Sequence, residues 1–268
     1  MKHSMLSLKI NINIYDNHNR HKTEFLLQNM NNTQKPIHAT SRFAIYFAPE
    51  INSKLHLLGS QWLGRDVNSG NLIKQPEIQN ITSEYFYKIT KNPSLYGFHA
   101  TLKAPFHLNI KYTLNDLQNH IKRLCASMQP FNMYLTVKQV GQFLALVMDP
   151  KEKKMVKLAS DLVKQADHFR APLQQSTIDK RRLSVLTRSQ DSNLLKWGYP
   201  YVLSDFRFHM TLTEKITLPS ARQQLENAAS LHFAPGLNDS IKVNNISLFY
   251  QKTIGAGFYQ IQRFQLGK

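Results

Sequence analysis

Two histidines in this sequence share a local pattern that could carry acid–base chemistry. His99 is followed two positions later by Thr101, His209 is followed in the same way by Thr211, and a leucine comes next in both stretches. Polar and apolar residues alternate through each stretch, which predicts two β-strands with one buried face. Each strand would present an imidazole and a hydroxyl side by side, so the two strands together could surround one small anionic group.

Such an arrangement suits the cleavage of a phosphodiester. In-line displacement at phosphorus needs a base on the attacking oxygen and an acid on the leaving oxygen, and imidazole is the side chain that titrates near neutral pH. The hydroxyls of Thr101 and Thr211 could donate hydrogen bonds to the non-bridging oxygens. The scheme requires neither a metal ion nor a cofactor. A lone histidine on a strand is usually structural, and it is the pairing of two matching motifs that favours catalysis.

The same alternation adds one polar residue to each motif. Lys103 is expected to share a strand face with His99, and Thr213 is expected to share one with His209. Both are weaker candidates, for electrostatic support. The cations Arg65, in a polar loop, and Arg182, in the run KRR, could each bind a phosphate or simply be solvated.

Composition is compatible with an anionic substrate. The chain has 268 residues, enough for one large domain or two small lobes, and a formal net charge of +17. A cationic surface attracts phosphorylated small molecules or nucleic acid. The lysines are nevertheless spread along the chain, which is also rich in asparagine and isoleucine, so a general compositional bias is the alternative explanation.

Cysteine content and hydropathy indicate the cellular compartment in which the protein is expected. The single cysteine, Cys125, excludes an internal disulfide and follows a helical apolar pattern, so it is expected in the core. No apolar run approaches the length of a membrane-spanning helix. We therefore expect a cytoplasmic protein that does not associate with membranes, and a monomer.

Two regions are expected. Residues 1–40 carry many asparagines and basic residues with short, interrupted apolar stretches, which predicts a disordered extension, with Met30 as an alternative start. Residues 41–268 are expected to form one folded domain. Its predicted strands are 42–48, the two histidine strands, 131–140, 143–149, 241–252 and 257–266. Five helices are predicted: one after Pro49, one that ends before Pro93, one over 113–128, one over 151–168 and one after Pro219.

The order of these elements contains an approximate internal repeat. Each histidine strand is followed by a helix and then by two strands. This order predicts an α+β fold of two lobes across a groove, each lobe contributing one His-x-Thr motif.

The two motifs resemble those of the two-histidine (2H) phosphoesterase superfamily, which includes bacterial 2′,5′ RNA ligases and cyclic nucleotide phosphodiesterases. ITKNPSLYGFHATLKAPF (89–106) and KWGYPYVLSDFRFHMTLT (196–213) resemble one branch of it, a poorly characterised bacterial family associated with phosphonate metabolism. RFAIYFAP (42–49) and WLGRD (62–66) are similar too. The resemblance covers residues 42–268.

The resemblance implies a bilobal α+β fold, with pseudo-symmetric lobes of antiparallel sheet and helices around a central groove. It also implies that His99 and His209 are the acid–base pair and that Thr101 and Thr211 bind the phosphate. Which histidine is the base stays open at this point. Tyr46 is a further, weak candidate for a substrate contact.

Three functions remain to be separated. The first is a metal-independent phosphodiesterase that opens a cyclic or small phosphodiester; the family context suggests a ribose cyclic phosphate from phosphonate degradation. The second uses the same site on RNA ends, as a 2′,3′-cyclic phosphodiesterase or a 2′,5′ ligase, and would show affinity that falls steeply with salt. The third is a non-catalytic protein that binds phosphorylated ligands or RNA.

Overall fold

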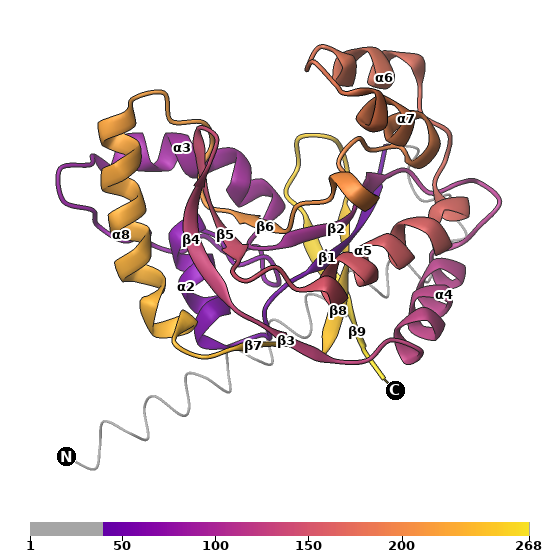
Figure 1. Cartoon of the computed structure of the whole chain (residues 1–268), viewed down its shortest axis with the longest axis horizontal. Coiled ribbons are helices and arrows are strands. Elements are labelled where there is room, and N and C mark those ends of the chain that lie inside the picture. The colour runs from indigo at the N-terminus through magenta and orange to yellow at the C-terminus, as the bar shows by residue number, and fades with distance from the viewer. Residues whose placement is uncertain (1–39, 268) are drawn as a thin grey trace.

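The structure is a computed structural model that describes residues 40–267. The predicted extension 1–40 therefore lies outside the described residues, except for Thr40. Seven strands form one antiparallel sheet in the order β4-β5-β6-β2-β1-β8-β9, and β3 and β7 form a second, two-stranded sheet (Figure 1). The strands are β1 (Arg42–Phe47), β2 (Ala100–Phe106), β3 (Phe131–Met133), β4 (Leu135–Val140), β5 (Phe143–Met148), β6 (His209–Thr211), β7 (Ile241–Val243), β8 (Asn245–Gln251) and β9 (Tyr259–Gln265).

The helices form two groups, one at each end of the sheet, and both groups contribute to one hydrophobic core. Figure 1 shows α2, α3 and α8 in the group near β4 and β5, α4 and α5 in the group near β8 and β9, and α6 and α7 above the second group. Their bounds are α2 (Lys54–Leu63), α3 (Ser83–Tyr96), α4 (Leu114–Ala126), α5 (Lys153–Gln165), α6 (Gln175–Arg182), α7 (Arg188–Trp197) and α8 (Pro219–Leu237), with the short 3₁₀ turns η1 (Asp167–Phe169) and η2 (Leu203–Asp205). Among the described residues, no helix is long and apolar enough to cross a membrane.

The two repeat units predicted from the sequence are interleaved. Strand β6 of the second unit pairs with β5 of the first, while β8 of the second unit pairs with β1, next to β2 of the first. The helices are exchanged in the same way, since α4 packs on β8 and β9 and α8 packs on β4 and β5. Each half of the sheet is therefore built from both units, and the two histidine strands meet at its centre.

The fold class predicted from the sequence, α+β with antiparallel sheet, is confirmed. The described strands form one continuous central sheet whose halves join at β2 and β6. The arrangement as two pseudo-symmetric lobes around a groove stays a prediction.

The predicted end of α3 was wrong. The helix continues through Pro93 to Tyr96. Proline lacks the N–H that would bond to the carbonyl four residues earlier, here that of Ile89. The backbone N–H of Glu214, just after β6, bonds to this carbonyl instead, at 2.6 Å. A partner from a distant segment thus satisfies the group that proline leaves free.

Two predicted strands are each divided in the structure. The segment 131–140 becomes β3 and β4, and the segment 241–252 becomes β7 and β8. β3 and β7 leave the main sheet to pair with one another. Two helices, α6 and α7, lie in the segment 170–198, for which periodicity had predicted no element.

The central strands separate a large hydrophobic core from a small one. On β1, Phe43, Ile45 and Phe47 face the large core, and the alternate residues face the small cluster. The small cluster consists of Ala44, Tyr46, Ala48, Val67, Phe249 and Phe258. Cys125 is buried in the large core, as the sequence predicts. Tyr46 and Phe249 of this small cluster lie beside the ring of His99, one of the predicted site residues.

Candidate active site

The pairing of β2 with β6 sets the positions of both motifs. Ala100 lies opposite Met210 in an antiparallel register. One step along each strand, this register sets His99 opposite Thr211 and Thr101 opposite His209. Side chains directly opposite one another have Cβ atoms about 4.5–5.5 Å apart. The structure thus brings the four residues together, with each histidine facing the threonine of the other motif.

The two imidazoles are held in the same way. His99 Nδ1 lies 2.9 Å from the carbonyl oxygen of Gly97, and His209 Nδ1 lies 2.8 Å from that of Arg207. In both cases the carbonyl belongs to the residue two positions earlier. A carbonyl can only accept, so Nδ1 carries the proton in each ring. The neutral imidazoles then have their lone pair on Nε2, the nitrogen that can exchange a proton with a substrate.

Gly97 allows the first of these contacts. Its φ of 80° lies in a region that residues other than glycine rarely adopt. A Cβ atom at this position would lie 2.5 Å from Val67 Cγ2. The residue ends α3 and turns the chain into β2. It thereby directs its carbonyl oxygen at His99.

Tyr46 forms the floor beneath His99. The two rings are stacked, with centroids 3.7 Å apart and planes inclined by 24°. Phe249 and Tyr96 lie at 6.1 and 6.3 Å from the same imidazole. Burial lowers the pKa of His99 to about 4, the nearby His209 contributes in the same direction, and the Gly97 carbonyl opposes them. His99 is therefore a neutral imidazole at physiological pH, a state suited to a base.

This shift predicts a pH dependence of stability. A histidine in the unfolded chain titrates near 6.5, so between pH 4 and 6.5 the unfolded state binds more protons at this position. The free energy of unfolding should therefore rise as the pH is raised through this interval, by roughly 2 kcal/mol after allowance for the partly exposed ring. His99→Gln should flatten this rise. Urea denaturation at pH 4.5, 5.5 and 7 measures it; parallel curves for the two proteins would contradict the prediction.

The threonines contribute hydroxyls at the same place. Thr101 Oγ1 lies 3.3 Å from His99 Nε2, so the hydroxyl can donate to the lone pair of that nitrogen. Thr101 is opposite Tyr46 on one side, and Thr211 is opposite Ala145 on the other. Both side chains are half-buried, which leaves their hydroxyls accessible to a small ligand.

Lys103 does not share a face with His99 and Thr101, contrary to the prediction. Lys103 lies opposite Ile45 and Thr101 lies opposite Tyr46, so one extra residue, Leu102, is inserted in β2. A bulge of this kind changes the side to which the following side chains point. The Lys103 ammonium instead lies under α5, where it pairs with Asp167 at 2.9 Å and donates to the Val163 carbonyl at 3.3 Å. Burial lowers the pKa of Lys103, and the pairing with Asp167 opposes that shift.

Thr213 is also displaced from the site. It is fully buried, and its Oγ1 accepts a hydrogen bond from the Leu144 backbone N–H at 3.0 Å. Strand β6 ends at Thr211, and the hydroxyl extends the pairing with β5 past that end. The predicted alternation fails here because the strand is shorter than the sequence pattern.

The two arginines predicted as weak substrate contacts are already paired. Arg65 is buried and donates to the carbonyls of Ser94 and Phe258, which braces the segments that flank His99. Arg182 forms a two-pronged ion pair with Asp191, at 2.7 and 2.9 Å. Either guanidinium would have to give up these partners to contact a substrate.

The structure adds three residues that the sequence had not singled out. Tyr96, at the end of α3, and Tyr199, after α7, both act electrostatically on Tyr46, and Arg181 lies over the Tyr199 ring at 4.8 Å. The available sequence signals were the run KRR at 180–182 and the YPY at 199–201. Neither signal indicated which member of its run points inward.

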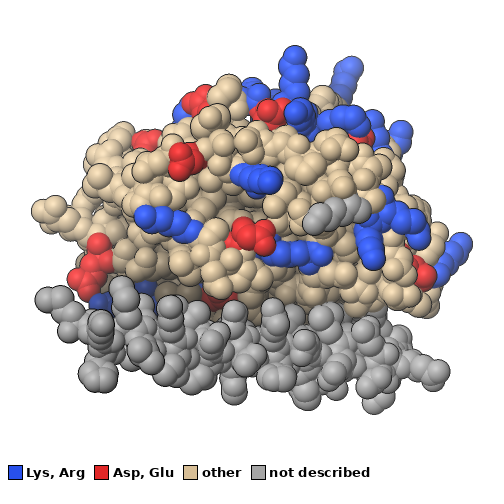
Figure 2. Space-filling model, turned by 90° about the horizontal axis from the view of Figure 1, so that it is seen from below, with Lys and Arg blue, Asp and Glu red and all other residues tan. Residues whose placement is uncertain are grey.

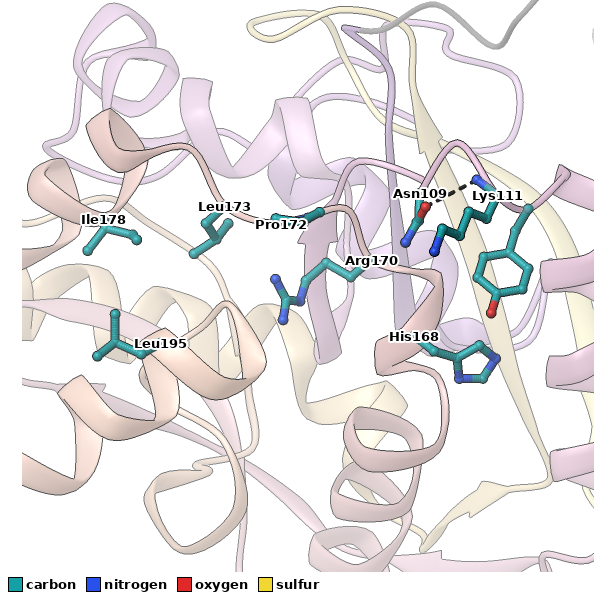
Figure 3. A pocket seen from close by; sticks show the side chains of 9 residues that line it. Asn109, Lys111, His168, Arg170, Pro172, Leu173, Ile178 and Leu195 are labelled. Atoms are coloured by element: carbon teal, nitrogen blue, oxygen red, sulfur yellow. Dashed lines mark hydrogen bonds between the residues drawn. The ribbon is translucent and has the colours of Figure 1, made fainter.

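Two hollows in the described part of the chain are separate from this site. One, of about 560 Å³, lies between η1, the loop after β2 and α6–α7 (Figure 3). Its lining includes Lys111, His168 and Arg170 at one end and Leu173, Ile178 and Leu195 at the other. The second, of about 400 Å³, lies near Pro49 and Asn245. Neither is lined by a predicted site residue, so neither is assigned to the chemistry.

The donor set at the two motifs consists of imidazoles and hydroxyls. Across residues 40–267, no group of three or more His, Cys, Asp or Glu side chains is arranged to hold a metal ion. The side chains of the two motifs can transfer protons at two imidazole Nε2 atoms and donate hydrogen bonds from two hydroxyls.

Two curated relatives are identical to this chain at about a third of the aligned positions. One from Janthinobacterium sp. (strain Marseille) is 33% identical over 227 residues, and one from Laribacter hongkongensis (strain HLHK9) is 29% identical over 217 residues. Both are named ribose 1,5-bisphosphate phosphokinase PhnN. The matches cover 83% and 81% of this chain but 50% of each relative, so the chain spans about half the length of these proteins.

Solved structures of 2H phosphoesterases are similar at lower identity. Escherichia coli LigT complexed with phosphate is 15% identical, with a TM-score of 0.43, over 86% of this chain and 99% of that one. Kluyveromyces marxianus Usb1 with uridine monophosphate is 11% identical, with a TM-score of 0.33, over 84% of this chain and 100% of that one. Similarity at this level does not transfer an activity.

One family model matches most of the domain. It is described as a protein of unknown function, DUF1045, and it matches residues 101–259, which include both threonines and His209. This agrees with the narrower resemblance predicted from the sequence, to a poorly characterised family. The match covers more than half of the chain, and the chain therefore belongs to the DUF1045 family.

Proposed function

We propose that this chain is a phosphodiesterase that opens a cyclic or small phosphodiester by acid–base catalysis between His99 and His209, without a metal ion. The observation that carries the proposal is the register of β2 with β6, which sets each histidine opposite the threonine of the other motif. Two proton-transfer groups with equivalent anchoring then lie beside two hydroxyls. This is the arrangement that in-line displacement at phosphorus needs.

In the proposed reaction, His99 is the base and His209 is the acid. The neutral His99 Nε2 takes a proton from the attacking water, a new P–O bond forms, and the bond to the leaving oxygen breaks. His209, protonated on both nitrogens, gives its Nε2 proton to that oxygen. Thr101 and Thr211 donate to the non-bridging oxygens, whose charge persists through the displacement. Proton exchange with solvent then restores both rings.

For the substrate, we propose a ribose cyclic phosphate as the first compound to test. The curated relatives are named for a ribose bisphosphate, which supports a ribose phosphate as the substrate. We do not propose their kinase activity for this chain. The printed sequence contains no G-x-x-x-x-G-K-[ST] motif, the loop by which P-loop kinases hold nucleotide phosphates. The two His-x-Thr motifs support a phosphodiester as the substrate.

The test is turnover of a panel of phosphodiesters in the presence of EDTA. The panel contains ribose 1,2-cyclic phosphate, nucleoside 2′,3′-cyclic phosphates and an RNA oligomer with a 2′,3′-cyclic end. Turnover that survives EDTA and is lost in the His99→Ala, His209→Ala double variant is expected. Activity that requires an added metal would contradict the mechanism, and silence across the panel from folded protein would contradict the proposed reaction.

The same panel separates the small-substrate and RNA functions. Neutralising several phosphates makes RNA affinity fall steeply with salt, whereas a single small substrate depends on salt weakly. On the face seen in Figure 2, lysine and arginine side chains are interspersed with acidic and neutral ones rather than joined in one track. We expect the small cyclic phosphodiesters to be the better substrates.

A further inference from the structure

A group of hydrogen-bond donors lies beside His99 and has no role in the proton transfers. It is formed by Arg181 of α6, Tyr199 after α7, and Tyr46 of β1, with Tyr96 of α3 next to them. The group joins four elements that are far apart in the sequence. A guanidinium and phenol hydroxyls, with no carboxylate paired to them among the described residues, favour an anion.

Two atoms of this group are buried without a partner. Tyr46 is fully buried, and its hydroxyl forms no hydrogen bond within the described part of the chain. Arg181 Nε is shielded from solvent and is equally unpartnered. Buried polar atoms in folded proteins are nearly always paired, because an unpaired one costs free energy. A ligand that accepts hydrogen bonds would give both atoms the partner that they lack.

Comparison with the neighbouring Arg182 shows that, of these two side chains, the lack of an acidic partner in the described part of the chain is specific to Arg181. Arg182 is exposed and held by Asp191 through two hydrogen bonds. Arg181 has no acidic partner among residues 40–267 and instead lies over the Tyr199 ring, at 4.8 Å from Arg181 Cζ to the ring centroid. Two adjacent cations of one helix therefore differ: the first is unneutralised and turned inward, and the second is neutralised at the surface.

The group is continuous with the catalytic pair. The Tyr46 ring is stacked on His99 at 3.7 Å. Burial raises the pKa of Tyr46 well above its usual value; Tyr96 and Tyr199 raise it further, and Arg42 opposes them. The field of Arg181 acts in turn on Tyr199. Tyr46 thus touches His99 by stacking, Tyr199 acts electrostatically on Tyr46, and Arg181 lies over the Tyr199 ring.

We propose that Arg181, with the hydroxyls of Tyr199 and Tyr46, binds a second, terminal phosphate of the substrate, so that the preferred substrate is a cyclic phosphodiester that also carries a phosphomonoester. This inference rests on the proposed function. A phosphomonoester offers three acceptor oxygens, which matches a guanidinium fork plus phenol donors better than a neutral hydroxyl does. Binding requires a small displacement of α6. Every side chain of that helix, Arg181 included, keeps some exposure to solvent, so moving the helix exposes little apolar surface.

The test compares two substrates that differ in one phosphate. We would measure kcat/KM for adenosine 2′,3′-cyclic phosphate and for the same compound with a 5′-phosphate, in wild type, Arg181→Gln and Arg182→Gln. Wild type should prefer the 5′-phosphorylated compound by about 10- to 100-fold, as expected for a charge-assisted contact. Arg181→Gln should lose most of this preference. Arg182→Gln, which removes the same charge from the adjacent position, should keep it.

Direct binding separates this inference from the proposed function. The dissociation constants of adenosine 5′-monophosphate and of adenosine are measured by calorimetry for the same three proteins. If neither cyclic compound is turned over but the 5′-phosphate still binds through Arg181, the subsite stands and the proposed reaction falls. If both are turned over equally well, or if Arg182→Gln loses the preference as much as Arg181→Gln does, the proposed subsite is overturned and the reaction stands. Equal binding of both ligands by all proteins, without turnover, overturns both.

Discussion

Replacing either His99 or His209 with alanine is expected to lower kcat for a cyclic phosphodiester by about 100- to 10,000-fold, the usual range for loss of a general acid or base. The double variant should be little worse than either single variant, because two groups that act in one displacement are not additive. The matched control is His168→Ala, since this histidine is exposed, follows α5 and lies outside the site. Its kcat should stay at the wild-type value.

The two histidines should also differ in their effect on the pH profile. With the pKa of His99 near 4, the acidic limb of kcat/KM is expected close to pH 4 to 5, well below the value for an ordinary histidine. His99→Ala should remove this limb from the residual activity, and His209→Ala should keep it. Circular dichroism and thermal unfolding establish that each variant is folded. A variant of either histidine that retains more than about a tenth of the activity would contradict the assigned acid–base roles.

Gly97→Ala is expected to damage both stability and catalysis. A side chain at φ 80° is strained, and its Cβ would lie 2.5 Å from Val67 Cγ2, so we expect a loss of about 2–3 kcal/mol in the free energy of unfolding. The carbonyl of this residue fixes the proton of His99 on Nδ1. Any rotation of the peptide misplaces the base, and we expect kcat to fall by about 10-fold or more.

A second glycine provides the control for backbone strain alone. Gly141, in the turn between β4 and β5, also has positive φ, at 60°, but a Cβ there meets nothing within 4 Å. Gly141→Ala should cost about 1 kcal/mol and leave kcat unchanged. Adding Val67→Ala to Gly97→Ala should recover only a small part of the lost stability and little activity, because the contact with Val67 Cγ2 at 2.5 Å is removed while the contact with Cβ at 2.8 Å and the φ strain remain. Equal effects of the two glycine substitutions on kcat would show that Gly97 has no positioning role.

Local patterns in the sequence were sufficient to select the four residues of the proposed site. Alternation predicted the histidine strands, and the repeated His-x-Thr pattern predicted the four residues that the β2–β6 register sets opposite one another. Caps and prolines placed most helices within a few residues. These features depend on neighbours in the chain, so they can be recognised without the fold.

Contacts between distant segments decided the rest. The carbonyl of Ile89 is satisfied by Glu214, which lets a helix pass through Pro93. The inserted Leu102 turns Lys103 away from His99, and pairing with Leu144 holds Thr213 in the interior. Each of these outcomes depends on a hydrogen-bonding partner or a strand register more than forty residues away, which no local periodicity encodes.

The surroundings of the base are likewise a property of the tertiary structure. The sequence by itself determined that two imidazoles and two hydroxyls are available on two strands. Only the assembled sheet stacks Tyr46 on His99, lowers the pKa of that histidine, and turns Arg181 inward while Asp191 holds Arg182 at the surface. The physical reason is that burial and charge are set by whatever packs around a residue, whereas the alternation of a strand is set by the residue and its immediate neighbours.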